Sequence, residues 1–558
     1  MAEEVKVEVR PKAYVIGTIA VVLVVTFVAF LALFSRAGAV FQLVANVWDL
    51  MVYTDIMFVF FWPILLSGIT TLIVKNGKGL NKQELALIVS MVWVAWIIPT
   101  YYGVVSSMTL VGTARAIPAF QKWTMDWGRV NNWKFGPDPM VAAYWESWMY
   151  GGPVPWGAWM PAIAIWILTI LPFYLSFLFL AALWRRQWVD IEVLPFPYAT
   201  GAASLINMAY ERDEKRVPRI LTNMFLWSGV VVGFFAIFPY WAPVLLPGLG
   251  LTAPANAGYG FGYDLTPLAL VPWVPLNFNF EPFWIGALFL VPTTTLFSYI
   301  ITTLITRFIW PPLMVALGIW DAMSPGNYAF GVQYGAMWRG WTGPLGRVWT
   351  HTWGAVAWLG IGAIMGLNLY PLLVFRGDVA EMIRSVFGKG RREVEEKEPM
   401  KYRYLWAGYI TCILLYSIAW WYRSEGNLPL AAGFLVTIGY HLYYGIGMAR
   451  SSAEFGQPVN TQDDTYLHIW NYNAKVWWLA DPASPFFIRN LQTRYLTMRA
   501  DLFYCGEIIR GNPASYALEA FKIGSITGLH SKRIFLGAAI AVIVGVITTY
   551  FVFLPMWH

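Results

Sequence analysis

The residues best suited to ion or proton chemistry lie in two charged clusters, each at the end of a long apolar stretch. The first cluster is WRRQWVDIEVLPFP at residues 184–197, and the second is MARSSAEFGQP at residues 448–458. In each cluster an acid, Glu192 or Glu454, lies between the apolar stretch and a proline or glycine that breaks a helix. An ionisable group held at membrane depth indicates a binding or coupling function. We therefore interpret both acids as candidates for binding a cationic solute or carrying a proton.

Each acid has arginines nearby in the sequence. Arg450 and Glu454 are four residues apart, share one face of a helix and can pair. For Glu192 we predict Arg186 or Arg185 as the partner, because a carboxylate left charged and alone at membrane depth is very unfavourable. The simpler interpretations are that the arginines of the first cluster stop membrane insertion and that the second cluster forms a surface ion pair.

Three aromatic residues complete the candidate site. Trp188 lies within the first cluster, and His441 and Tyr444 lie in the apolar stretch GFLVTIGYHLYYGIGM that precedes the second. A histidine at this depth is either a packed helix contact or a proton relay, and both interpretations stay open. The candidate substrate-binding or coupling residues are Arg186, Trp188, Glu192, His441, Tyr444, Arg450 and Glu454.

The composition indicates the class of protein. Of the 558 residues, 58% are hydrophobic and 12% are charged, about half the charged share of a soluble domain. The basic residues lie between apolar stretches, which is typical of topology signals rather than of a nucleic-acid surface. The five histidines lack metal-ligand spacing, and the two cysteines lie far apart, as inert thiols would. We predict no metal, no cofactor, no nucleic-acid partner and no enzymatic activity.

The hydropathy pattern predicts an all-α polytopic integral membrane protein with roughly 11–14 transmembrane helices, some of them broken or re-entrant. A short or kinked helix is expected at WPPLMVALGIW, residues 310–320, because two prolines interrupt a short apolar run. Two related halves are an open alternative. The predicted division is an N-terminal half, 1–350, with external loops 113–156 and 242–281, and a C-terminal half, 351–558, with a cytoplasmic amphipathic segment 449–532.

Charged loops set the expected orientation. The lysines of KNGKGLNK, residues 75–82, place that loop and the N-terminus in the cytoplasm. Lys78 and Lys389 should therefore face the cytoplasm, and Asp138 and Asn256 the outside. The expected location is the plasma membrane of a prokaryotic cell, with lipid as a partner and a homodimer as an open alternative.

Both clusters also carry a family resemblance. The "RRQWV-x-x-E-x-L-x-FP" pattern that begins at Arg185 and the "R-x-x-AE-x-G-x-P" pattern that begins at Arg450 resemble those of a prokaryotic, largely uncharacterised branch of oligopeptide-transporter-like membrane proteins. Further likenesses are LNKQELALIVSM and the stretch from TMRADL to KIGSITGL, so the resemblance extends over most of the chain. It implies a multi-helix fold of two related halves with broken helices, and proton-coupled uptake. The chain is shorter than typical oligopeptide transporters, and its YATGA segment departs from their signature.

We therefore predict a secondary transporter of a small organic or peptide-like solute, with protons as the expected coupling ion. The alternative is a non-transporting membrane scaffold or a subunit of a larger membrane complex. A polar cavity near mid-membrane, lined by Glu192 or Glu454, would favour the transporter.

Overall fold

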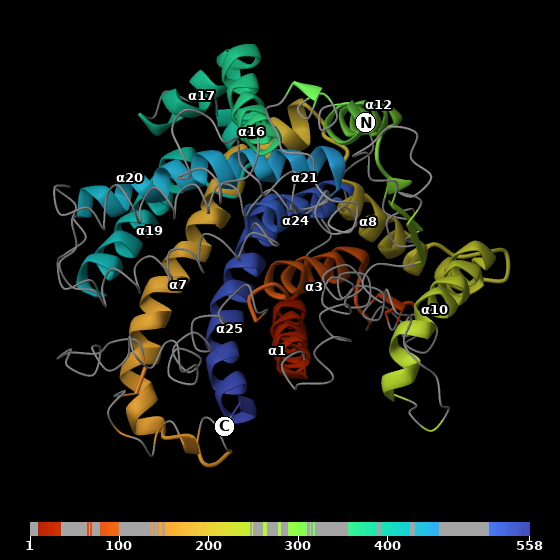
Figure 1. The fold of residues 1–558 in the computed structure, drawn as a ribbon, viewed down its shortest axis with the longest axis horizontal. Coiled ribbons are helices and arrows are strands. Elements are labelled where there is room, and N and C mark those ends of the chain that lie inside the picture. The colour runs from red at the N-terminus through yellow and green to blue at the C-terminus, as the bar shows by residue number, and fades with distance from the viewer. Residues whose placement is uncertain are drawn as a thin grey trace.

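A computed structural model of the chain describes residues 9–34, 79–99, 151–245, 288–309, 355–387, 392–423, 430–456 and 513–557, two short strands, and a few short pieces between them. Helices dominate these residues, as predicted (Figure 1). The predicted broken helix at residues 310–320 lies almost entirely outside the described residues, as do Lys78, Lys389, Asp138 and Asn256.

The helices and strands have the following bounds. The α-helices are α1 Pro11–Phe34, α3 Lys82–Ala95, α7 Trp156–Arg185, α8 Pro197–Tyr210, α9 Arg219–Thr222, α10 Met224–Leu245, α12 Thr293–Thr303, α16 Ala355–Val374, α17 Arg376–Val386, α18 Arg392–Glu395, α19 Tyr402–Arg423, α20 Leu430–Tyr440, α21 Ala449–Phe455, α24 Pro513–Thr527 and α25 Ser531–Trp557. Three π-helical segments extend them, η2 Arg186–Ile191, η5 Leu304–Ile309 and η9 His441–Met448. The strands are β1 Phe261–Asp264 and β2 Asn277–Phe280.

The two strands are a departure from the all-α prediction. They pair antiparallel, with Phe261 opposite Phe280. Aromatic residues, which are common in strands, alternate with glycine, asparagine or aspartate in both strands. The ribbon lies within the loop predicted for residues 242–281.

Four of the described helices are long and apolar enough to cross a membrane, by length and composition. They are Pro11–Ala29, Trp156–Ile191, Tyr402–Tyr422 and Ser531–Met556. A helix rises about 1.5 Å per residue, so about 20 residues cover a bilayer core of about 30 Å. The apolar pattern predicted a helix at each of these places.

The core forms where these helices pack on one another. α7 packs along α19, and α25 packs between α1, α3 and α7 (Figure 1). Gly408 on α19 lies against the ring of Phe179 on α7, at a place where an added Cβ would clash with that ring. Small residues of this kind let apolar helices approach closely.

The starts of α1, α3 and α25 lie side by side at one end of the helix bundle. Arg10, just before α1, pairs with Glu84 in the first turn of α3 at 2.6 Å. Gln83 donates a hydrogen bond to the Gly528 carbonyl in the turn between α24 and α25.

The end of α7 and the start of α19 lie at this same end. Arg185 donates two hydrogen bonds to Glu398, four residues before α19, at 2.8 and 2.9 Å. Ser531 at the start of α25 donates to the Lys397 carbonyl. The opposite ends of α7 and α25 also lie side by side, because Trp156 at the start of α7 stacks on Phe551 near the end of α25.

Glu84 is the centre of the polar network that joins α1 to α3. Its side chain is fully buried and accepts hydrogen bonds from the backbone and the guanidinium of Arg10. Glu84 also closes a capping box with Asn81, in which each side chain accepts a hydrogen bond from the other residue's amide.

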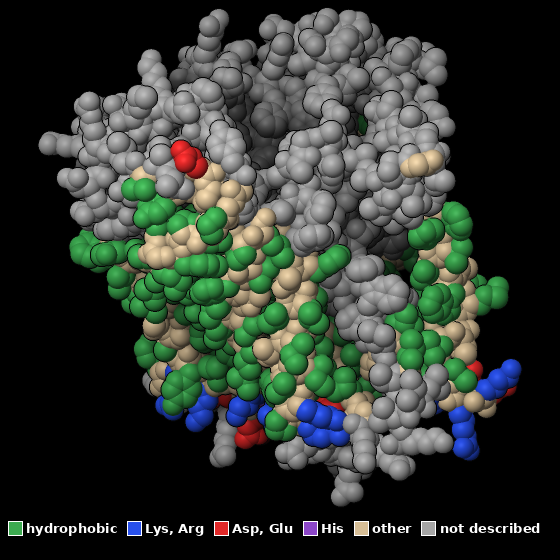
Figure 2. Space-filling view, turned by 90° about the horizontal axis from the view of Figure 1, so that it is seen from below, with side chains coloured by type: hydrophobic (Ala, Val, Ile, Leu, Met, Phe, Trp, Pro, Cys, Tyr) green, Lys and Arg blue, Asp and Glu red, His purple; other side chains and the backbone are tan. Residues whose placement is uncertain are grey.

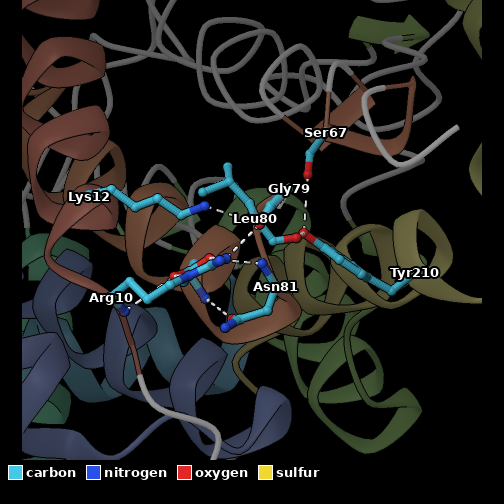
Figure 3. A network of polar contacts seen from close by, with 8 residues as sticks. Arg10, Lys12, Ser67, Gly79, Leu80, Asn81 and Tyr210 are labelled. Carbon is cyan, nitrogen blue, oxygen red and sulfur yellow. Dashed lines mark hydrogen bonds and ion pairs between the residues drawn. The ribbon is translucent and has the colours of Figure 1, made fainter. Parts of the chain in front are cut away.

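The network continues to α8 (Figure 3). Tyr210 donates a hydrogen bond to the Leu80 carbonyl, and its hydroxyl lies 3.2 Å from that of Ser67. Lys12 donates to the Gly79 carbonyl. The segment before α3 is therefore held by side chains from α1 and α8.

We predict that Glu84→Gln lowers the melting temperature by several degrees at neutral pH. Burial alone would raise the pKa of Glu84, but hydrogen bonds from Arg10 and from the Asn81 amide hold it below its ordinary value. Its stabilising contribution is therefore present above the ordinary carboxyl pKa of about 4.3 and is lost as the pH falls through the lower folded-state value.

Thermal unfolding at several pH values checks this prediction. The difference between the variant and the original chain should shrink towards acidic pH. Glu211→Gln is the matched control, because the Glu211–Arg219 pair is exposed and should contribute little. An equal loss in both variants would contradict the prediction.

Candidate functional site

The first break in the helices follows α7. The helix widens into the π-helical η2, and the chain then turns through residues 192–196 before α8 begins at Pro197. Val193 and Phe196 have positive φ values of 50° and 44°, which are unusual for residues with large side chains. Proline lacks an amide donor and disfavours helical geometry in the residue before it, so Pro195 and Pro197 end the helix here. Strained backbone and π-helical turns are often found at functional sites.

The second break follows α20 in the same way. α20 widens into η9, continues as α21, and ends at Gly456, whose φ of 72° is typical of a glycine that terminates a helix.

The two breaks pack against each other. The Phe196 amide donates a hydrogen bond to the Ala453 carbonyl at 2.8 Å. A Cβ added to Gly456 would lie 2.9 Å from the ring of Pro197, so the two backbones are in close contact. We call the region where residues 192–197 meet residues 450–456 the break junction.

The break junction contains a buried ion triad made of Arg450, Glu192 and Glu454. Arg450 Nη2 lies 2.6 Å from Glu192 Oε2, and Arg450 Nε lies 2.9 Å from Glu454 Oε1. The side chains of Arg450 and Glu192 are 5% and 6% exposed, whereas that of Glu454 is 31% exposed. Gln187 also donates a hydrogen bond to Glu192 Oε1 at 2.8 Å.

The triad contains two acids and one base. Burial raises the pKa of Glu454, and the neighbouring Glu192 adds to this, while Arg450 opposes it. The arginine also lies over the ring of Tyr370 on α16, 5.0 Å from the ring centre. Since one arginine serves two carboxylates, Glu454 is the group of the triad best placed to take up a proton.

The predicted ion pairs are partly right. The Arg450–Glu454 pair is confirmed. The prediction that Arg186 or Arg185 pairs with Glu192 is wrong, because Arg450 from the second cluster does so. The two acids therefore share one site, which no short-range spacing in the sequence could indicate.

The arginines of the first cluster have other partners. Arg185 is buried and pairs with Glu398 and with Asp190. Arg186 lies 3.5 Å from Asp378 on α17. These contacts tie the end of α7 to the segment before α19, so they anchor the helix rather than the acids of the triad.

Two of the aromatic candidates, Trp188 and His441, contact side chains that do not belong to the triad. Trp188 is buried and stacks on Trp184. His441 is buried between α7 and α19, with Nε2 3.1 Å from the Ser176 hydroxyl and Nδ1 3.3 Å from the Tyr409 hydroxyl. The side chain of Tyr444 lies outside the described residues. The contacts of His441 fit the packed helix contact better than a relay to the triad.

Sequence reasoning missed Gln187 and Tyr370 as neighbours of the triad. Gln187 lies within the first cluster, five residues before Glu192, which suits the wider turn of a π-helix. No sequence signal relates Tyr370 to Arg450, because 80 residues separate them. Among the described residues, no group of three or more His, Cys, Asp and Glu side chains could hold a metal ion.

The fold and the triad together define a predominantly helical protein with four helices of membrane-crossing length and apolarity, and with two broken helices that meet at buried charges. Residues 3–558 match the model of a family of unknown function, DUF6785, and the chain belongs to that family. No curated protein matches the chain.

We predict that Gly456→Ala destabilises the protein by roughly 1–3 kcal/mol, through the strain of a positive φ and the contact with Pro197. Gly366→Ala is the matched control. Gly366 lies on an exposed face of α16, with nothing within 4 Å of the added Cβ, and alanine favours a helix more than glycine does. Thermal unfolding compares the two variants, and an equal melting temperature for both would contradict the close packing of the breaks.

Proposed function

We propose that the protein is a secondary membrane transporter of a small organic or peptide-like solute, driven by protons. The observation that carries the proposal is the break junction, where two interrupted helices enclose two acids and one arginine. Interrupted helices are tolerated within a membrane where they pack on protein or line a solute pathway. Charged groups placed there are typical of substrate and coupling-ion sites.

Placement in the membrane of a prokaryotic cell is part of the proposal. Figure 2 shows a broad apolar face with Lys and Arg side chains gathered along one edge. Exposed apolar side chains cover α1 and α25, among them Ile19, Leu23, Ile543 and Phe551. Lys12, Lys532 and Arg403 lie in the first turns of α1, α25 and α19. The basic edge should face the cytoplasm, because basic residues are retained on that side.

The triad suggests how a proton would be used. Protonation of Glu454 converts its carboxylate to a neutral acid and weakens the ion pair with Arg450 Nε. Arg450 keeps its pair with Glu192, and its Nη1, which no described residue binds, can donate to a carboxylate of the solute. Proton binding and solute binding are thereby linked through one guanidinium.

A ligand screen followed by uptake tests the proposal. Purified protein is heated with peptides, amino acids and metal chelates, since a ligand of the folded state raises the melting temperature. A compound found in this way is then offered to proteoliposomes with an imposed pH gradient. The original chain should accumulate it with the gradient.

We predict that Glu454→Gln abolishes the proton-driven part of uptake while the protein still inserts and folds. Arg450→Gln should remove binding of the compound in the thermal assay. Glu211→Gln, at an exposed acid far from the junction, is the control and should transport normally. Proton-driven uptake by Glu454→Gln equal to that of the control would refute the coupling. If no compound stabilises the protein and no uptake is seen, the result favours a scaffold.

We also predict the sidedness of two exposed positions. Lys215 follows α8, whose Tyr210 reaches the segment before α3, so it belongs to the basic end. Pro153 precedes α7 at the opposite end. In single-cysteine variants of a cysteine-free chain, an impermeant reagent added to intact cells should label position 153 and spare position 215. The reverse pattern would invert the proposed orientation.

A further inference from the structure

The second candidate for ion chemistry lies in α24, outside the triad. α24 packs against α3, α7, α8, α21 and α25, and in Figure 1 it lies between α21 and α3. Almost all of its residues are buried. The sequence predicted an amphipathic segment at 449–532, whereas this part of it is enclosed. With 15 residues, α24 is shorter than a membrane-crossing helix and is not among the four long apolar ones.

Glu519 lies in the middle of this buried helix. The residue is 1% exposed, and no cation among the described residues pairs with its carboxyl group. The indole of Trp93 on α3 faces the carboxyl group. Trp93 in turn contacts the rings of Tyr198 on α8 and Tyr516 on α24. The surroundings of this acid are therefore aromatic and uncharged.

The other buried acids are bound differently. Glu84 pairs with Arg10, Glu192 with Arg450, and Glu398 with Arg185, at 2.6 to 2.8 Å. A buried carboxylate without a cation is strongly unfavourable, so an acid in this position takes up a proton instead. Burial accordingly raises the pKa of Glu519 well above its usual range.

Charged groups on the elements around α24 do not pair with Glu519. Asp190 on η2 pairs with Arg185 and also attracts the ammonium group of Lys522, and Arg450 and Glu454 on α21 pair within the triad. The tyrosines that face this region, Tyr198 and Tyr516, are neutral at physiological pH. The nearest cation along the helix is Lys522, one turn further on.

Lys522 holds the first break. Its ammonium group donates a hydrogen bond to the Leu194 carbonyl at 3.0 Å and lies 5.6 Å from the centre of the Phe196 ring. Leu194 lies between Val193 and Phe196, the two residues of the break with positive φ. The hydrogen bond from Lys522 therefore supports strained backbone. Residues three apart on a helix are neighbours, which puts Glu519 within reach of the lysine side chain after a change of rotamer.

We propose that Glu519 is a proton-binding site and that loss of its proton draws Lys522 away from the Leu194 carbonyl into an ion pair with Glu519. The carboxylic acid releases H⁺ to solvent and becomes a carboxylate, and the lysine stays an ammonium ion throughout. The break is then held when Glu519 is protonated and released when it is not. This inference concerns a different acid from Glu454 and does not depend on transport of a solute.

Two buried acids provide a matched test by thermal unfolding. Glu398→Gln removes a carboxylate that is already paired and should lower the melting temperature at neutral pH. Glu519→Gln replaces a neutral acid by a neutral amide of similar shape, and should leave the melting temperature unchanged or raise it.

The pH dependence has a definite sign. The pKa of Glu519 is higher in the folded state than in the unfolded state. The stability linked to its proton is therefore fully present when the pH is below the unfolded-state pKa, and it is lost as the pH rises towards the folded-state pKa. The melting temperature of the original chain should therefore fall relative to that of Glu519→Gln as the pH rises above the ordinary carboxyl pKa of about 4.3. A Glu519→Gln chain that melts below the original by the same margin at every pH would overturn the proposal.

A second measurement follows the break itself. Leu194 is 8% exposed, so a Leu194→Cys variant in a background without Cys412 and Cys505 reports opening through its rate of maleimide labelling. At each pH, the labelling rate of this variant is divided by that of the same variant carrying Glu519→Gln. This ratio cancels the effect of pH on the reactivity of the thiol. The ratio should rise several-fold with pH, and Lys522→Met should label fast throughout. A ratio that stays constant would refute the link between Glu519 and the break.

Discussion

The guanidinium of Arg450 is the interaction on which the rest of the site depends. It lies between Glu192 from the first break and Glu454 from the second, and the side chains of Arg450 and Glu192 are almost fully buried. Without the arginine, the carboxylates of Glu192 and Glu454 would repel each other in a low-dielectric interior. This repulsion would push the two breaks apart. Arg450 neutralises this repulsion. The two breaks can therefore pack closely, with Gly456 against Pro197 and a hydrogen bond from Phe196 to Ala453.

The same constraint explains how the ends of the helices are arranged. Arg10 with Glu84 and Arg185 with Glu398 join helices that are far apart in the sequence. Each pair occurs where an apolar helix begins or ends, so the charges stay near the edge of the apolar body. Arg185 and Arg450 both follow an apolar stretch and stay buried by pairing with two acids each, and Arg450 also lies over the ring of Tyr370.

Much of the fold could be predicted from local sequence patterns. Continuous apolar stretches predicted the four long helices, and the spacing of Arg450 and Glu454 predicted their pair. The capping box of α3 likewise depends on two residues only three positions apart, Asn81 and Glu84. These features depend on residues within one helical turn or one uninterrupted run.

The parts that could not be predicted depend on tertiary contacts. The partner of Glu192 comes from 258 residues further along, and nearby arginines were more plausible candidates by spacing alone. Glu519 gave no signal, because an acid within SYAL-E-AFK resembles the solvated position of an amphipathic helix until its neighbours on α3 and α8 are known. The π-helical turns η2 and η9 have no sequence signature that would distinguish them from α-helix.

The order of the pairs along the chain has a consequence for biosynthesis. Arg185, Glu192 and the strained turn before α8 leave the ribosome early, whereas their partners Glu398, Arg450 and Lys522 are made hundreds of residues later. During that interval the nascent chain contains unmatched charges and an unsupported turn beside one of its long apolar helices. Assembly of this region can finish only after α24, which contains Lys522, has been made, so a chain that stops before α21 would leave Glu192 without Arg450 and the turn without Lys522.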